Sequence, residues 1–264
     1  MKRSLSEQAN AGLPLEVPII DSHAHLGPYH NFHVPFNSPA GMIATMDALG
    51  IDTCCTATHL GIGPDFRAGN DIALKAATDY PGRFIGAICI NPNYPDAVLA
   101  EIDRFAASDA MRAIKLHPAL HNYPADGEEY KIVYGAAGNR RLPVACHTWA
   151  GDRRCAPKMY VALAKEYPET TFILIHSGGE VGPIMEAIDA ARQSENIYLD
   201  TSGSLTFRTV ERIVDALGSQ RLLFGSDMPF IDPAAQLGKV IYASIPEEAK
   251  LDILGRNAKR VFRI

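Results

Sequence analysis

Eight short apolar runs alternate with helix-length segments along this chain, and no other feature constrains its fold as much. Each run is continuously apolar, which is typical of a strand buried on both faces of a parallel sheet. Strands that alternate with helices form parallel β-α-β units. The strand-like runs cover residues 17–25, 52–59, 83–91, 112–118, 142–148, 171–178, 196–203 and 221–227.

The segments between these runs are typical of helices. Examples are residues 39–50, 95–108, 157–168 and 209–218, and a last helical stretch covers 246–262. Several begin with Pro, Ser or Thr and end at Gly, as helix termini prefer. Eight β-α units in a chain of 264 residues favour a closed (β/α)8 barrel, which typically uses about 250 residues.

The main alternative fold is a doubly wound open sheet. That fold requires a glycine-rich phosphate loop after the first strand, and "HAHLGPYHNFH" is not such a loop. We therefore predict an α/β protein with one domain, a (β/α)8 TIM barrel over residues 17–264. Residues 1–16 are predicted to form a flexible N-terminal arm.

Composition narrows the class of protein. With 47% hydrophobic and 21% charged residues and a net charge of −5, the chain has an ordinary soluble composition. Its Lys and Arg residues are scattered, which argues against partners such as nucleic acid or a membrane surface. The five cysteines lack C-x-x-C spacing and mostly lie in apolar runs, so buried free thiols are expected.

Two further patterns bear on localisation. The first segment has no apolar core typical of a signal peptide. No run approaches the ~18 apolar residues of a membrane-spanning helix. Together with free thiols, which a reducing compartment maintains, these patterns predict a cytoplasmic protein.

Two histidines lie one residue apart at the end of the first apolar run. In a strand, residues two apart point to the same side, so His23 and His25 share a face. The carboxyl end of a barrel strand is where active sites lie. Two converging imidazoles can bind one metal ion, although an isolated H-x-H pattern also fits half-buried histidines with hydrogen-bond partners.

Other predicted strands end in similar side chains. Burying many titratable groups costs several kcal/mol each unless they are paired or bound to a metal. The number of such residues at strand ends therefore favours a shared functional site, although His59 and His117 could simply line a water-filled barrel mouth. The residues are His59, Lys115, His117, His147, His176 and Asp227.

The ordered set of motifs resembles the amidohydrolase superfamily, in its amidohydrolase-related (amidohydrolase 2) branch. The motifs are "IDSHAH", "IKLHP", "PVACHT", "LIHSGG", "FGSDMPF" and "LGRNAKRVF". The resemblance extends from about Pro18 to Phe262. Its branch includes metal-dependent hydrolases and lactonases, and also non-oxidative decarboxylases of aromatic and muconate-type acids. The metal ligands are the same in both reactions, so the motifs do not separate them.

The resemblance implies one divalent metal per chain, most often zinc, held by His23, His25, His147 and Asp227. Three imidazoles and a carboxylate suit zinc chemically, and manganese, cobalt and iron are alternatives. The resemblance also implies catalytic roles for Asp227 and His176. Asp227 would accept a proton from metal-bound water, and His176 would polarise that water or contact the substrate.

Lys115 has two interpretations. In two-metal members of the superfamily, a lysine on the fourth strand is carboxylated and bridges the metals, with His176 on the second metal. Lys115 would otherwise pair with Asp21 or Asp200 inside the barrel. Asp21 is expected to support the two histidines from beneath.

Substrate contacts are expected from loops at the same rim. Trp149 could stack on a substrate ring or pack its own loop. Arg153, Arg154 and Arg67 could clamp a carboxylate or be solvated surface residues. His117 is a further candidate for substrate contact.

The main functional prediction is a metal-dependent hydrolase acting on a small cyclic or carboxylated substrate, such as a lactone, amide or ester. The alternative is a metal-dependent, non-oxidative decarboxylase of an aromatic or muconate-type acid. Two further alternatives are a metal-free lactonase and a non-catalytic binding barrel. The partner expected in each case is a small molecule, and a homodimer is possible.

Overall fold

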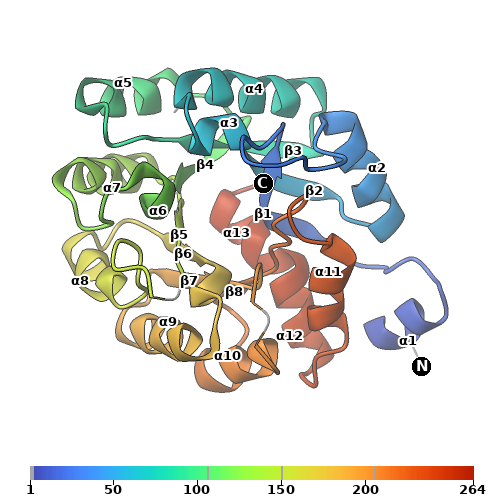
Figure 1. The fold of residues 1–264 in the computed structure, drawn as a ribbon. Helices are drawn as coiled ribbons and strands as arrows, with labels where there is room; N and C mark the ends of the chain where they lie inside the picture. Colours follow the sequence, from blue (N-terminus) through green and yellow to red (C-terminus); the bar gives the residue numbers. More distant parts are fainter. Residues whose placement is uncertain (1–2, 106, 150, 205) are drawn as a thin grey trace.

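The computed structural model describes residues 3–105, 107–149, 151–204 and 206–264. Its strands form one parallel sheet in the order β1 to β8, which confirms the predicted (β/α)8 barrel (Figure 1). The strands are β1 (Ile20–Leu26), β2 (Thr53–Thr58), β3 (Phe84–Cys89), β4 (Met111–Leu116), β5 (Val144–His147), β6 (Phe172–Ile175), β7 (Ile197–Asp200) and β8 (Leu222–Leu223).

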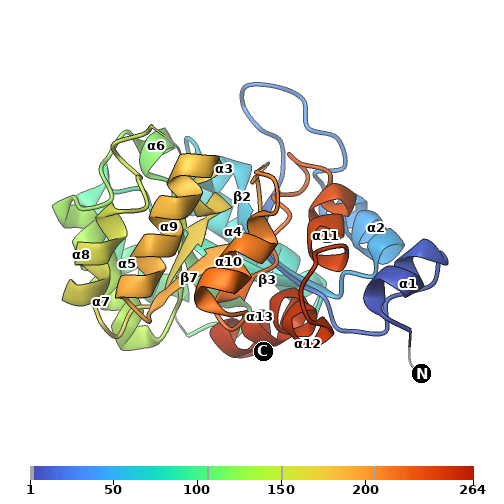
Figure 2. The same cartoon turned by 90° about the horizontal axis from the view of Figure 1, so that it is seen from below.

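Helices surround this sheet, and the loop between β1 and α2 rises above one end of the barrel (Figures 1 and 2). In the described part of the chain, no helix has the length and apolar character needed to cross a membrane. The α-helices are α1 (Leu5–Asn10), α2 (Pro39–Leu49), α3 (His59–Ile62), α4 (Phe66–Asp79), α5 (Pro95–Phe105), α6 (Pro118–His121), α7 (Glu128–Arg140), α8 (Met159–Glu166), α9 (Val181–Gln193), α10 (Thr209–Leu217), α11 (Pro233–Ile241), α12 (Glu247–Leu251) and α13 (Asn257–Phe262). Two short irregular turns are η1 (His176–Gly178) and η2 (Asp252–Arg256).

Helix ends follow from local sequence, as α2 illustrates. Ser38 is its N-cap, and the Ser38 hydroxyl accepts a hydrogen bond from the Gly41 amide at 3.1 Å. Pro39 occupies the first turn, where a missing N–H is tolerated. Gly50 ends the helix with a φ of 72°, a left-handed conformation that glycine adopts without steric cost.

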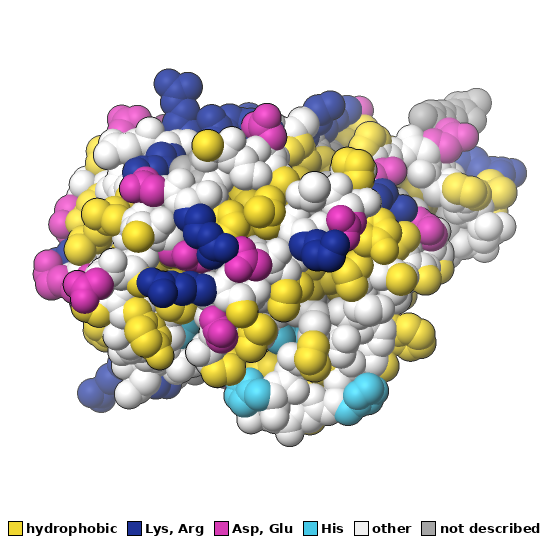
Figure 3. All heavy atoms as spheres, turned by 90° about the horizontal axis from the view of Figure 1, so that it is seen from above, with side chains coloured by type: hydrophobic (Ala, Val, Ile, Leu, Met, Phe, Trp, Pro, Cys, Tyr) yellow, Lys and Arg dark blue, Asp and Glu magenta, His cyan; other side chains and the backbone are white. Residues whose placement is uncertain are grey.

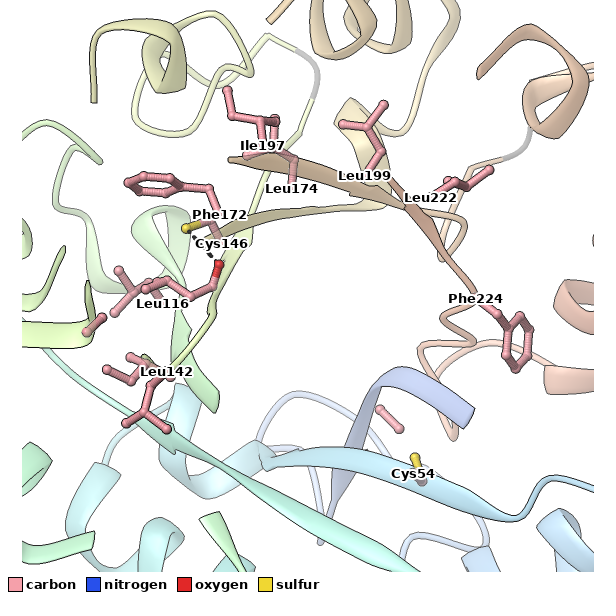
Figure 4. Packing of buried hydrophobic residues seen from close by; sticks show 14 of the residues in the cluster. Cys54, Leu116, Leu142, Cys146, Phe172, Leu174, Ile197, Leu199, Leu222 and Phe224 are labelled. Atoms are coloured by element: carbon pink, nitrogen blue, oxygen red, sulfur yellow. Dashed lines mark hydrogen bonds between the residues drawn. The ribbon is translucent and has the colours of Figure 1, made fainter. Parts of the chain in front are cut away.

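The two faces of the strands carry different side chains. Large apolar residues such as Leu116, Phe172 and Phe224 belong to the outer cluster beneath the helices, and Figure 4 shows them pointing away from the barrel centre. The interior cluster contains smaller residues such as Ala113 and Ala145. Lys115 shares the face of Ala113 because residues two apart in a strand point the same way.

The barrel closes between its first and last strands. β8 is shorter than the predicted run 221–227, because the residues after Leu223 form only an isolated bridge with β1, between Ala24 and Met228. The Asp227 amide donates to the His23 carbonyl at 2.8 Å, and the His25 amide donates to the Met228 carbonyl at 2.8 Å. This closure places His23, His25 and Asp227 side by side.

The N-terminal segment contains α1, which packs against α11. Leu5 is buried there, and its amide donates to Glu247 at 3.2 Å. Flexibility of residues 1–16 stays a prediction. All five cysteines are buried and free, as predicted.

Candidate metal centre

Three buried side chains converge at the carboxyl end of the barrel. His23 lies on β1, His176 follows β6, and Asp227 follows β8. One donor atom from each lies within 4.8 Å of the other two. Imidazole nitrogen and carboxylate oxygen are ligands for divalent metals such as zinc, manganese and iron. The geometry therefore fits a divalent metal ion.

The Asp227 carboxylate lies between two imidazoles of β1. Its Oδ1 is 3.2 Å from His23 Nε2 and 3.4 Å from His25 Nε2. Burial opposes ionisation, but the adjacent His23 and His25 imidazoles hold the pKa of Asp227 well below its usual value. Burial also lowers the pKa values of both histidines, which favours the neutral imidazole that binds metals.

One buried nitrogen supports the same interpretation. Apart from its 3.2 Å approach to Asp227, His23 Nε2 has no polar partner among the described residues. A buried polar atom left without a partner costs about 1–3 kcal/mol. A metal ion would satisfy the His23 nitrogen, since that nitrogen already faces Asp227.

His147 was predicted as a ligand, and the structure places it at the end of β5, beside the group of three. Its ring centroid is 4.9 Å from that of His176. On its other side, His147 stacks on His117 with centroids 3.8 Å apart and planes 16° apart. His117 Nδ1 also accepts the Leu120 amide at 3.2 Å, so His117 caps α6. The ligand role of His147 and the substrate role of His117 stay predictions.

His176 lies in a turn of unusual backbone conformation. His176, Ser177, Gly178 and Gly179 have φ values of 66°, 46°, 84° and 76°. A left-handed conformation costs a non-glycine residue roughly 1–2 kcal/mol, and such residues are concentrated at functional sites. The turn also ends β6 at Ile175, so the predicted strand 171–178 is too long. It directs the His176 ring back towards the barrel mouth.

Two buried carboxylates lie beneath this group. Asp21 accepts hydrogen bonds from the amides of His23 and Ser226, both at 3.0 Å. Asp200 accepts the His176 amide at 2.6 Å. Burial raises the pKa values of both carboxyls to about 7. Asp21 therefore fixes β1 to the segment after β8, and Asp200 fixes the turn after β6.

Lys115 is a buried lysine inside this part of the barrel. It is 1% exposed, and its Nζ has no hydrogen-bond partner among the described residues. Burial lowers its pKa, whereas Asp227 and Asp200 oppose that shift. No hydrogen bond therefore joins its ammonium group to Asp21 or Asp200. Carboxylation of Lys115 and binding of a second metal or the substrate stay predictions.

The arginines predicted to clamp a carboxylate differ in their surroundings. Arg154 donates to Asp152 from Nε at 2.9 Å and Nη2 at 2.7 Å, and to Asn122 from Nη1 at 2.7 Å. Arg153 is exposed, and Arg67 is exposed beside the ring of Phe66. Because its donors are already engaged, Arg154 is the least available of the three.

Aromatic side chains flank the mouth on two sides. On one side, Phe230 has its ring centroid 4.4 Å from His59, 4.9 Å from Tyr29 and 5.7 Å from Phe32. We call these four residues the aromatic wall. On the other side, Trp149 is 38% exposed and lies 5.5 Å from His176, measured between centroids.

Sequence reasoning missed Phe230, and it also missed Ser202 and Gly203 at the end of β7. Phe230 ends the "FGSDMPF" motif, three residues after Asp227, and this position was the available signal. Ser202 and Gly203 follow Asp200 in "DTSG". Their contact with His176 depends on pairing between β6 and β7, which local sequence does not reveal.

The outer surface carries charges of both signs. On the face drawn in Figure 3, Lys and Arg side chains are interspersed with Asp and Glu, and histidines gather along one edge. This face therefore presents no continuous patch of a single sign.

The similarity to known proteins extends over the whole barrel. Residues 20–264 match the sequence profile of the amidohydrolase family. A gamma-resorcylate decarboxylase of Rhizobium sp. (strain MTP-10005) is 25% identical over 285 residues, covering 83% of this chain and 85% of the relative.

Solved structures share the fold. One is a 2,6-dihydroxybenzoate decarboxylase in complex with 2,6-dihydroxybenzoate, with a TM-score of 0.74 and 18% identity, covering 94% of this chain and 99% of the other. Another is a 5-carboxyvanillate decarboxylase from Novosphingobium aromaticivorans DSM 12444, complexed with manganese and 4-hydroxy-3-methoxy-5-nitrobenzoic acid. Its TM-score is 0.72 at 16% identity, and the match covers 100% of both chains.

The prediction of a hydrolase is wrong, because the similar curated proteins are decarboxylases. Both reactions use the same ligand pattern in this superfamily, so the strand-end motifs could not distinguish them. The broader prediction of an enzyme is supported. A divalent metal is also supported, whereas zinc itself is not, since the metal in the 5-carboxyvanillate decarboxylase is manganese.

Proposed function

Because this chain belongs to the amidohydrolase family, we propose that it is a metal-dependent, non-oxidative decarboxylase of a hydroxylated aromatic carboxylic acid. The observation that carries the proposal is the convergence of His23, His176 and Asp227 between aromatic side chains at the barrel mouth. Decarboxylases of dihydroxybenzoate and carboxyvanillate with the same fold support this reaction class.

His23, His25, His147 and Asp227 are the proposed metal ligands, and His176 is close enough to serve as a donor as well. The bound divalent cation would supply positive charge that holds the anionic oxygens of the substrate. Manganese is the first metal to test, because the 5-carboxyvanillate decarboxylase structure contains it. Mixed nitrogen and oxygen ligands are compatible with manganese and with zinc.

The substrate ring is proposed to lie between Trp149 and the aromatic wall. Offset or edge-to-face contacts between rings contribute about 0.5–1.5 kcal/mol beyond simple burial. Trp149 and Phe32 are partly exposed, 38% and 57% respectively, so apolar surface remains available for a ring. A planar aromatic acid fits this arrangement better than a flexible aliphatic one.

The reaction breaks the bond between the ring and its carboxyl carbon. The electron pair stays on the ring carbon, CO2 leaves, and a proton drawn from solvent is added at the same position. Asp227 and His176 lie together at the proposed reaction centre, so we assign them the holding and transfer of that proton. Burial lowers the pKa of His176 to about 4, so its imidazole is neutral near pH 7 and would carry the proton only transiently, between solvent and the ring carbon.

The test uses purified protein loaded with Mn²⁺ and given 2,6-dihydroxybenzoate or 5-carboxyvanillate as a probe. We expect loss of the acid with stoichiometric formation of CO2 and of the decarboxylated phenol, resolved by liquid chromatography. Asp227→Asn should lower kcat by about 10²–10⁴-fold, and Ser204→Ala should retain turnover. Absence of decarboxylation across a panel of hydroxylated benzoates, with metal bound, would contradict the proposal.

A further inference from the structure

A buried serine connects His176 to Asp200. We propose that Ser202 is a positioning residue that holds the neutral His176 imidazole as the Nδ1–H tautomer, with its Nε2 lone pair facing the metal centre. The inference deepens the proposed function, on which its activity measurement rests. Nothing in the sequence motifs assigned a role to Ser202.

The direction of the hydrogen bonds follows from two distances. The Ser202 hydroxyl donates to Asp200 Oδ1 at 2.8 Å, and the same Oγ lies 3.1 Å from His176 Nδ1. A hydroxyl has one hydrogen and can accept two bonds. Since that hydrogen points to Asp200, His176 Nδ1 must carry the proton and donate to Ser202.

The direction is independent of the protonation of Asp200. Its Oδ1 also accepts the His176 amide at 2.6 Å, so this oxygen is an acceptor from two donors. Its Oδ2 has no hydrogen-bond partner among the described residues. Any proton on the carboxyl would therefore reside on Oδ2, and Ser202 would still donate to Oδ1.

Gly203 brings this loop against the imidazole. Its φ is +66°, and a Cβ built there would lie 2.6 Å from His176 Nδ1. No side chain fits at that distance. The residue after Ser202 is therefore glycine for two reasons, its backbone conformation and its direct approach to the ring.

The loop is fixed from its other side by Lys239. The Lys239 ammonium donates to the carbonyl of Thr201 at 2.6 Å and to that of Ser204 at 2.9 Å. Ser204 in turn shares a hydrogen bond with the Thr209 hydroxyl at 2.9 Å. Because these contacts hold the residues on both sides of Ser202, removing its hydroxyl should leave the loop in place.

The tautomer matters for proton transfer. With hydrogen on Nδ1, the neutral ring presents a lone pair at Nε2 and can accept a proton or a metal there. With the hydrogen on Nε2 instead, the neutral ring can do neither at that atom. Loss of a group that orients such a histidine typically lowers activity or metal affinity about 10–100-fold.

The decisive measurement is the tautomer of His176, read from the nitrogen chemical shifts of protein labelled with ¹⁵N-histidine. The spectrum is recorded on metal-free protein, because an ion bound at Nε2 would by itself fix the proton on Nδ1, and again with Zn²⁺, which does not broaden it. The resonance is assigned by its loss in His176→Asn. We expect Nδ1–H in the native protein, a tautomer mixture in Ser202→Ala, and Nδ1–H again in Ser202→Thr. Ser204→Ala is the matched control, since it removes a buried hydroxyl from the same loop without touching His176.

Activity gives a second measurement. We expect Ser202→Ala to lower kcat about 10–100-fold while KM and metal per chain stay unchanged, and Ser202→Thr to recover most of the loss. An unchanged tautomer in Ser202→Ala, or an equal fall of kcat in Ser204→Ala, overturns the inference. If the native protein decarboxylates none of the probes, the proposed function fails, but the nitrogen shifts still decide the role of Ser202.

Discussion

The outer faces of the barrel strands and the carboxyl rim of the same barrel differ in packing, backbone conformation and hydrogen bonding. On the outer faces, residues such as Phe172 and Leu174 are fully buried and packed against helices. At the rim, His176 and Asp227 have left-handed backbone conformations, with φ values of 66° and 61°. Buried atoms there, including Lys115 Nζ, lack hydrogen-bond partners among the described residues.

Within one strand, the outward-facing side chains therefore contribute to stability, and the residues at its carboxyl end contribute to function. Apolar burial on the outer faces is the dominant favourable contribution to folding. Strained residues and buried ionisable groups at the rim reduce stability, and they persist because the surrounding barrel holds them in place. Changes on the two sides should therefore affect different measurements.

The largest effect on stability is expected from the outer face. Phe172→Ala removes a fully buried ring and should lower the free energy of unfolding by about 3–5 kcal/mol. Urea denaturation measures this change. Metal content per folded chain should stay the same. A loss of stability below about 1 kcal/mol would contradict the assignment of stability to the outer face.

The opposite pattern is expected for Asp227→Asn at the rim. Loss of a proton-transfer group should lower kcat by about 10²–10⁴-fold. The free energy of unfolding of the metal-free protein should stay within about 1 kcal/mol of the native value. Destabilisation as large as that of Phe172→Ala would mean that Asp227 is chiefly structural.

Metal removal should lower the stability of the folded state by a smaller amount, and this loss should depend only on residues at the rim. Free metal at one hundred times its dissociation constant stabilises the folded state by about 2.7 kcal/mol. Chelation should therefore lower the Tm of the native protein and of Phe172→Ala to a similar extent. His23→Ala should show no such shift in calorimetry, and a full shift in that variant would exclude His23 as a ligand.

The smallest effect is expected at Trp149, which is 38% exposed. Trp149→Ala should raise KM by roughly 2–10-fold, the equivalent of one ring contact of about 0.5–1.5 kcal/mol. Thermal unfolding should be almost unchanged. Equal KM values for the variant and the native protein would move the substrate ring away from Trp149.

The fold was predictable because its determinants are local. Each strand is a short continuous apolar run, and α2 carries its own Ser38 cap and Gly50 terminus. The residues that gather at the rim were also predictable in kind, since His23, His176 and Asp227 all follow apolar runs. Strand direction alone places such residues at the same end of a parallel barrel.

Other features depend on contacts between distant segments. The hydrogen bond of Ser202 with His176 and the approach of Phe230 to His59 require the assembled barrel. The end of β6 was missed because "FILIHSGG" reads as a continuing strand, whereas His176 turns the backbone. The reaction type could not be predicted, since hydrolysis and decarboxylation share one ligand pattern.

The closure of the barrel has a consequence for how the enzyme is made. Asp21 and Ser226, whose hydrogen bond joins the two edges of the sheet, are 205 residues apart in the chain. His23 and Asp227 therefore meet only after nearly the whole protein has left the ribosome. Such long-range contacts form slowly, and an incomplete nascent chain cannot bring His23 and Asp227 together. We therefore expect the proposed metal to bind only to finished molecules.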